Sequence, residues 1–95
     1  MPEFEWHEVK NLKNWWKHDI TFGDAMKIWD DPERHPFTAK TVDGELRYRM
    51  VGHYGSRIIS VIHTFRGKGK IRVISARDAS RKEVREYHEA RRNRG

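Results

Sequence analysis

The sequence predicts an α+β fold in the order β-α-α-β-β-β-α, an antiparallel meander sheet with helices packed on it. Three observations predict it: alternating apolar residues over 45–53, 57–66 and 69–77, short glycine-bearing connectors between these segments, and a helix-capping motif after the last one. At 95 residues the chain is expected to form a single domain over residues 1–95, without internal repeats or linkers.

The N-terminal third is expected to hold one short strand and two helices. Phe4-Glu5-Trp6 alternates like a strand, and from Glu8 to about His18 apolar residues recur every three or four positions, as in a helix. Thr21 is a candidate N-cap of a second, short helix, which Asp31-Pro32 ends because the residue before proline avoids helical geometry.

The segment from Arg34 to Thr41 is less regular, since Pro36 delays any strand until Phe37, and Asp43-Gly44 is typical of a turn. The three meander strands follow. Ser80-x-x-Glu83 is then a capping box, in which each residue satisfies a backbone N–H at the start of the last helix.

The charge of the chain is divided unevenly. The net charge is +6, with about −4 in residues 1–45 and +10 in residues 46–95. Such a division indicates a half that faces a polyanion and an acidic half that receives a different, basic partner; the alternative is that the charges only solvate a small domain. Absence of cysteine, of a long apolar run and of a signal-peptide pattern predicts a cytoplasmic protein with no membrane contact.

Arginines in the last strand are the most informative residues. Arg72 and Arg77 lie in an Ile- and Val-rich strand, where an arginine is costly unless an anion or a carboxylate meets it. In a regular strand they face opposite sides, so a bend or bulge is needed to turn Arg77 toward a cleft shared with Arg72 or Arg47. The alternative for Arg77 is a salt bridge with an acidic residue of the N-terminal half, for instance Glu5 or Asp31.

Three residues are candidates for proton transfer. His63, in the middle of the second meander strand, could act as general acid or base, and the alternative is a half-buried histidine bonded to a neighbour. Lys17 and His18 end the first helix, where capping of the helix dipole also explains them. No histidine pair has zinc-ligand spacing and cysteine is absent, so neither a metal site nor another cofactor is expected.

Trp6 is the candidate platform for base stacking among four tryptophans, although most tryptophans of a small domain belong to its core. Arg57, Arg81 and Lys82 are expected to contact RNA as further cations of the basic half. Adjacent Trp15 and Trp16 cannot both face inward on one helix, so one of them is expected at a partner surface or at the sheet rim.

The order and spacing of several short motifs carry a family resemblance over nearly the whole chain. These motifs are Phe4-Glu5-Trp6, Lys10, Asn14, Lys17-His18, Phe22-x-x-Ala25, Asp30-Asp31-Pro32, Glu45-x-Arg47, Gly52, Val61-Ile62-His63-Thr64, Ile71 to Arg77, Ala79-Ser80-Arg81-x-Glu83 and Tyr87. With them the chain resembles the BrnT-like ribonuclease toxins of bacterial type II toxin–antitoxin pairs.

The resemblance implies a RelE-like fold, metal-independent endoribonuclease activity that halts translation, and inhibition by a BrnA-like antitoxin. Two toxins with two antitoxins, and DNA contact only through the antitoxin, would be expected. Two positions depart from the family pattern: His7 stands where Asp is usual, and Asp19 where Gly is usual.

The leading hypothesis is therefore an endoribonuclease that uses the 2′-hydroxyl of its RNA as nucleophile. Arg47, Arg72 and Arg77 would hold the scissile phosphate, and His63 or Lys17 and His18 would move protons. The rival hypotheses are a non-enzymatic nucleic-acid-binding module and an inactive interaction subunit of a toxin–antitoxin complex.

Overall fold

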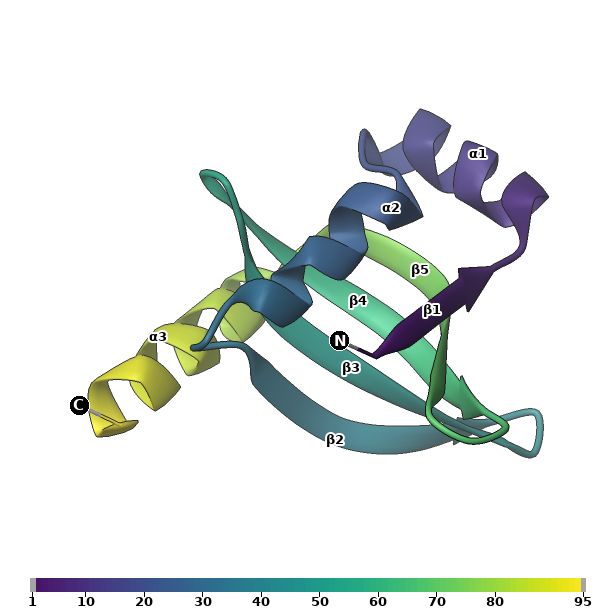
Figure 1. Ribbon diagram of the computed structural model, residues 1–95. Helices are drawn as coiled ribbons and strands as arrows, with labels where there is room; N and C mark the ends of the chain where they lie inside the picture. The colour runs from purple at the N-terminus through teal and green to yellow at the C-terminus, as the bar shows by residue number, and fades with distance from the viewer. Residues whose placement is uncertain (1, 95) are drawn as a thin grey trace.

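The computed structural model describes residues 2–94 and forms one five-stranded sheet with helices on both faces (Figure 1). The elements in chain order are β1 (Glu3–Trp6), α1 (Glu8–His18), α2 (Phe22–Ala25), the 3-10 helix η1 (Met26–Asp30), β2 (His35–Val42), β3 (Glu45–Tyr54), β4 (Arg57–Arg66), β5 (Lys70–Asp78) and α3 (Arg81–Arg94). Their order across the sheet is β1-β5-β4-β3-β2. The α+β class and the meander of β3, β4 and β5 are thus confirmed.

One strand of the sheet was missed in the predicted element order. β2 pairs antiparallel with β3 and joins it through Asp43-Gly44, where both residues have positive φ, as a two-residue hairpin turn requires. Pro36 lies in this strand, at the edge of the sheet, where a missing N–H is tolerated. A register shift between Phe37 and Lys40 further breaks the alternation on which the prediction relied.

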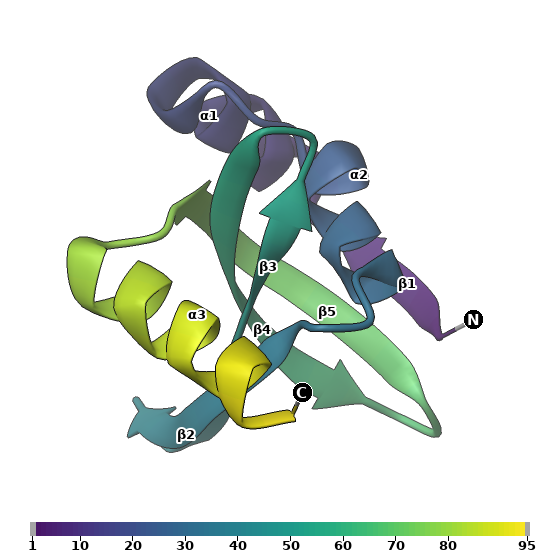
Figure 2. The same cartoon turned by 90° about the vertical axis from the view of Figure 1, so that its left-hand side faces the viewer.

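The main core lies between the sheet and the segment formed by α2 and η1. Its buried apolar side chains come from the segment 20–28 and from the central strands: Ile20, Phe22, Ala25, Ile28, Ile59, Val61, Val73 and Ala76. Figures 1 and 2 show this segment and α3 on opposite sides of the strands. Thr21 caps α2 by accepting a hydrogen bond from the Asp24 N–H, as predicted.

α1 contributes little to this core. Asn14 is its buried residue, and the Asn14 side chain binds the carbonyl of Ile20 and the N–H of Ala76, both at 3.0 Å. The apolar stripe that predicted the helix faces solvent instead: Trp15 is 55% exposed and Trp16 92%. The helix ends at Asp19, whose φ of 55° is the left-handed conformation that glycine adopts most easily.

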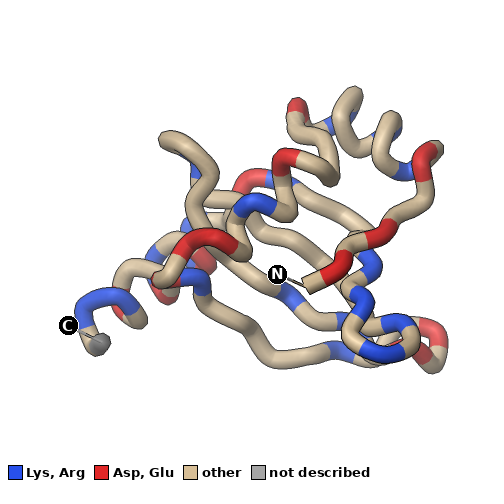
Figure 3. Tube along the Cα trace, in the orientation of Figure 1, with Lys and Arg blue, Asp and Glu red and all other residues tan. Residues whose placement is uncertain are grey.

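Several carboxylates of the acidic half pair with arginines of the basic half. Glu5 binds Arg72, Glu45 binds Arg66, and Glu33 lies 3.7 Å from Arg91. Figure 3 shows the acidic residues of β1 beside basic residues of β5. Internal ion pairs therefore occupy several of the carboxylates that were expected to receive a basic partner.

Candidate active site

An irregularity in β5 brings the two predicted arginines to the same face of the sheet. Arg72 pairs with Thr64 and Arg77 with Ser60, four residues apart on β4, because the register between β4 and β5 shifts by one residue at Ile62 and His63. Residues four apart on a strand point to the same side. The bulge that the sequence analysis required is thus present, and it puts Arg72 and Arg77 opposite the layer of α2 and η1.

Two arginines of β3 complete this surface. Arg49 pairs with Ile62 across the sheet, so it shares a face with Ser60 and Arg77, and Arg47 lies two residues away on the same side. We call the surface of Arg47, Arg49, Arg72 and Arg77 the arginine face. The four side chains are between 30% and 37% exposed.

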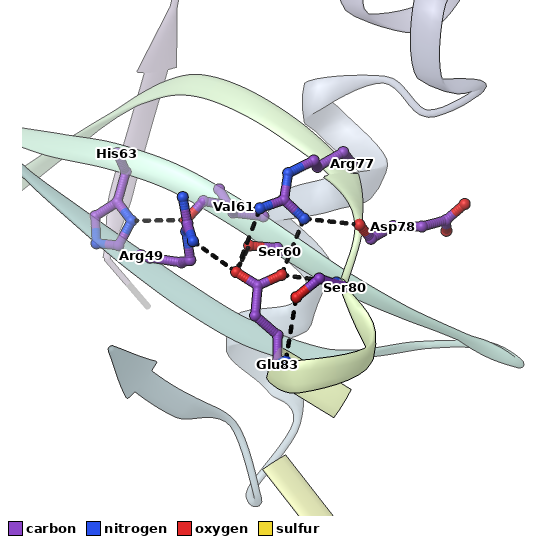
Figure 4. A network of polar contacts seen from close by, with 8 residues as sticks. All are labelled: Arg49, Ser60, Val61, His63, Arg77, Asp78, Ser80 and Glu83. Atoms are coloured by element: carbon purple, nitrogen blue, oxygen red, sulfur yellow. Dashed lines mark hydrogen bonds and ion pairs between the residues drawn. The ribbon is translucent and has the colours of Figure 1, made fainter. Parts of the chain in front are cut away.

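Glu83, at the start of α3, binds two arginines of the arginine face, Arg49 and Arg77 (Figure 4). Its carboxylate accepts hydrogen bonds from Arg49 at 2.7 Å and from Arg77 at 2.9 and 3.3 Å. The Ser60 hydroxyl donates to it as well, at 3.3 Å. Burial would raise the pKa of Glu83, but the hydrogen bonds from Arg77 and the Ser80 N–H and the two positive charges lower it to about 2.

The same carboxylate forms the predicted capping box. Glu83 accepts from the Ser80 N–H at 2.8 Å, and the Ser80 hydroxyl accepts from the Glu83 N–H at 3.2 Å. One residue therefore begins α3 and fixes two guanidinium groups at once.

The other two arginines also have carboxylate partners. Arg72 donates to Glu5 on the neighbouring strand at 2.7 and 2.9 Å, and Arg47 donates to Glu45 at 3.3 Å. The ion pair suggested for Arg77 does exist, but its partner is Glu83, whereas Glu5 pairs with Arg72. These partly exposed pairs orient the two arginines. Each pair stabilises the fold by only about 0–1 kcal/mol.

A groove of about 440 Å³ adjoins the arginine face, between β2 and α3. Its lining combines cationic and apolar side chains with one carboxylate: Phe37, Thr38, Ala39, Lys40, Val42, Arg47, Tyr48, Arg49, Ile62, Lys82 and Glu86. Arg47 and Lys82 are the predicted site residues that it brings together.

His63 lies on the opposite face from the arginines. It is 3% exposed, and its ring packs against Trp29 and Tyr48 at centroid distances of 5.0 and 5.9 Å. Burial lowers the pKa of His63, and its Nδ1 lies 3.4 Å from the carbonyl of Val61. This geometry matches the alternative interpretation, a buried histidine bonded to a neighbour, and separates His63 from any phosphate on the arginine face.

Arg57 contacts the end of α1, where Lys17 and His18 lie. The guanidinium of Arg57 donates to the carbonyl oxygens of His18 and Asp19, at 3.1 and 2.8 Å, and to the Asp78 carboxylate at 3.0 Å. Arg57 therefore connects α1 to the end of β5. This structural role was not predicted; only a contact with RNA was expected of Arg57. The exposed side chain of Lys17 and the half-buried His18 lie near this junction.

The remaining predicted residues divide between core and surface. Trp6 packs against the core, with its ring 6.3 Å from that of Phe22, so the structure favours the core interpretation over the stacking platform. Arg81 and Lys82 are exposed in the first turn of α3. Arg81 does not line the groove, whereas Lys82 does.

Sequence reasoning missed Arg49, Lys40 and Glu86. Arg49 could have been found, because it lies two residues from Arg47 in a recognised strand and must share its face. Lys40 pairs with Arg47 but lies in the strand that was not predicted. Within residues 2–94, no group of three or more His, Asp or Glu could hold a metal ion, and no helix there is long and apolar enough to cross a membrane.

Comparisons with known proteins agree with the resemblance seen in the motifs. Residues 6–83 match the sequence profile described as "Ribonuclease toxin, BrnT, of type II toxin-antitoxin system". The fold is similar to the crystal structure of the Brucella abortus ribonuclease toxin, BrnT, with a TM-score of 0.66 and 28% sequence identity, over 85% of this chain and 100% of that chain. No curated protein is significantly similar.

The profile match spans well over half of the chain, and the structural match covers the whole of the Brucella toxin. Both findings favour the ribonuclease hypothesis over the binding-module and inactive-subunit hypotheses. The chain belongs to the BrnT family of ribonuclease toxins of type II toxin–antitoxin systems.

Proposed function

We propose that this protein cleaves RNA on the arginine face and thereby halts translation. The observation that carries the proposal is the bulge in β5, which brings Arg72 and Arg77 to one side with Arg47 and Arg49. Arginine offers a planar set of donors that matches phosphate oxygens, and it stays charged at any cellular pH. Four such groups on one partly exposed face of the sheet suit one segment of RNA backbone.

The chemistry requires no group beyond the RNA and the protein. The 2′-hydroxyl loses its proton as its oxygen attacks the adjacent phosphorus, and the bond from phosphorus to the 5′-oxygen breaks. The 5′-oxygen takes up a proton, so the products carry a 2′,3′-cyclic phosphate and a 5′-hydroxyl. Negative charge grows on the phosphate oxygens as the bond forms. A preorganised donor aimed at such charge contributes about 3–4 kcal/mol to the transition state.

Glu83 acts in this scheme by orienting the arginines. A general base works best when its pKa is near the working pH, and the pKa of Glu83 is about 2. Its carboxylate stays charged and fixes Arg49 and Arg77 in place. His63 lies on the other face, and Lys17 and His18 lie at the end of α1 near Arg57, so proton transfer by any of the three stays a prediction.

The test is cleavage of RNA in EDTA by the purified protein and by Arg72→Ala. The matched control is Glu5→Gln, which breaks the same ion pair but leaves the guanidinium. We expect Arg72→Ala to lose at least about 100-fold in rate, as loss of one strong donor implies, and Glu5→Gln to keep most of the activity. Equal loss in both variants would mean that the ion pair, and not phosphate binding, is what cleavage needs.

The same variants can be compared in cells. Expression of the parent from a tight inducible promoter should arrest growth, and expression of Arg72→Ala should not. Growth arrest by both would exclude Arg72 from the toxic activity.

Membership of a type II toxin–antitoxin family implies an antitoxin. We propose that it binds the exposed stripe of α1 formed by Val9, Leu12, Trp15 and Trp16, each at least 52% exposed. Exposed Lys10, Lys13 and Lys17 lie on the same helix, so the stripe suits an amphipathic antitoxin helix with acidic flanks. Self-association of two copies through α1 is disfavoured, because it would bring the lysines of the two helices together.

Other features implied by the family resemblance stay predictions. They are the RelE-like fold, two toxins with two antitoxins, DNA contact only through the antitoxin and independence of metal ions. The cytoplasmic location, which was inferred from composition, also stays a prediction.

A further inference from the structure

The groove between β2 and α3 contains groups that phosphate binding does not use. Its apolar lining includes Phe37 and Ile62, and its volume of about 440 Å³ lies in the range of small-molecule sites. Phosphate needs cations, which the arginine face supplies, but it needs neither an apolar floor nor a carboxylate. The groove has both.

Glu86 is the carboxylate in this groove, and it is unusual among the acidic residues near the arginines. Glu5, Glu45 and Glu83 each bind an arginine. In the part of the chain that the structure describes, no hydrogen bond or ion pair engages the Glu86 side chain, not even with Lys82 one helical turn before it. The carboxylate oxygens of Glu86 are therefore available to a ligand that carries hydrogen-bond donors.

A nucleobase combines the required properties. Its faces are apolar and flat, its edge carries polar groups, and its flanking phosphates are anionic. A carboxylate only accepts hydrogen bonds, and its two oxygens suit two donors side by side. Guanine presents such a pair on its Watson–Crick edge, N1–H and the N2 amino group, whereas adenine and cytosine each present one amino group there.

The groove is also in the right place relative to the phosphate site. Arg49 lines the groove and donates to Glu83, which binds Arg77 with the same carboxylate. Lys40, Arg47 and Lys82 supply positive charge at the groove itself. A base in the groove would thus belong to a nucleotide next to a phosphate held by Arg77.

We infer that this groove is a nucleobase subsite that selects guanine through Glu86. The inference rests on the proposed RNA cleavage, since it assigns the base beside the scissile phosphate. A peptide segment of an antitoxin is the competing occupant; an acidic one would meet repulsion from Glu86.

Binding of oligonucleotides that cannot be cleaved tests the inference separately from catalysis. Fully 2′-O-methylated pentamers with a single guanine, adenine, cytosine or uracil at the centre lack the attacking hydroxyl, and fluorescence anisotropy gives their affinities. We expect the wild-type protein to prefer guanine about 5- to 150-fold, the discrimination of one bidentate pair. Glu86→Gln should bring the four affinities within about twofold of one another. The amide NH2 of glutamine would face one of the two N–H donors of guanine, so the pair of hydrogen bonds would be lost.

Glu89→Gln is the matched control, since Glu89 is exposed on the same helix and does not line the groove. It should keep the full preference for guanine. Circular dichroism of both variants shows whether the fold is intact, and binding of the adenine pentamer shows whether the phosphate contacts are.

Three results would overturn the inference: no preference in the wild type, an unchanged preference in Glu86→Gln, or an equal loss for all four pentamers in that variant. Loss of antitoxin binding by Glu86→Gln, with oligonucleotide binding unchanged, would assign the groove to the antitoxin instead. A guanine preference without any RNA cleavage would support the subsite and refute the proposed function. Cleavage of RNA without base preference would support the proposed function and refute the subsite.

Discussion

The hydroxyl of Tyr87 donates a 2.6 Å hydrogen bond to the buried carboxylate of Asp31. Tyr87 lies on α3 one turn after Glu83, and Asp31 follows the end of η1. The same carboxylate accepts from the backbone N–H of His53 at 3.0 Å, on β3. The Asp31 side chain therefore attaches the helix that orients Arg49 and Arg77 to both η1 and β3.

Tyr87→Phe should destabilise the protein because it removes this bond. A hydrogen bond to a charged group is worth about 1.5–3 kcal/mol, and chemical unfolding would measure the loss. Tyr54→Phe is the control: within residues 2–94 the Tyr54 hydroxyl makes no hydrogen bond, so its loss should change the free energy of unfolding little. Equal effects of the two substitutions would show that the bond to Asp31 does not stabilise the fold.

Glu83 should make the stability depend on pH in acid. Its pKa is lowered to about 2 in the folded protein, against 4.5 for the unperturbed group. Stability from this group is therefore complete above pH 4.5 and is lost as the pH falls toward 2, amounting to about 3 kcal/mol. The pKa of Asp31 is also lowered, by hydrogen bonds from Tyr87 and His53 that outweigh its burial, and it adds a loss of the same sign.

Urea unfolding between pH 6 and pH 2 tests this. Glu83→Gln should be less stable than the wild type at pH 6, and the difference should shrink as the pH falls. A carboxyl titration of the wild type followed by NMR should place the Glu83 midpoint near 2. A difference between the two proteins that stays constant from pH 6 to pH 2 would contradict the assignment.

Gly52→Ala should be destabilising because β3 approaches η1 closely at this position. A Cβ on residue 52 would lie 2.9 Å from the Cβ of Ile28 and 3.2 Å from its carbonyl oxygen. Overpacking of this kind costs about 1–3 kcal/mol, measurable as a lower melting temperature. Gly23→Ala is the control, since its Cβ would meet only the Thr21 hydroxyl at 3.9 Å. If Gly52→Ala melts no lower than Gly23→Ala, the close approach is not a constraint.

Trp16→Glu should weaken antitoxin binding without affecting the fold. Trp16 is 92% exposed, so its substitution removes little packing, whereas an aromatic anchor in an interface often contributes 2 kcal/mol or more. We expect at least about a 30-fold loss of affinity in a binding assay with the purified cognate antitoxin. Leu46→Glu alters another exposed apolar residue, 46% exposed on β3, and should bind normally. Full affinity in Trp16→Glu would exclude the α1 stripe as the docking site.

Local patterns were enough to predict much of this fold. Alternation located β3, β4 and β5, and the capping box located the start of α3. Alternation also carried a signal about His63 that was not used, since His63 lies two residues from the core residue Val61 on the same strand. A regular strand puts both side chains on one face, away from the arginines.

Other features depend on contacts between distant segments and could not be predicted locally. One extra residue in β5 decides whether Arg72 and Arg77 share a face, and the periodicity of a single strand does not reveal it. The stripe of α1 has the spacing of a core-facing helix, yet Trp15 and Leu12 face solvent because the helix is attached through Asn14. An amphipathic pattern reports an apolar surface but not whether this chain covers it.

The parallel pairing of β1 with β5 has a consequence for the newly made protein. Glu5 meets Arg72 only after the 66 intervening residues have been synthesised, and Glu83 is made later still. No partial product that ends before β5 can close the sheet or align its arginines. Folding must wait for these long-range contacts, which are slow to form. Until β5 has been made, the growing chain lacks both Arg72 and Arg77, and the proposed phosphate site is incomplete.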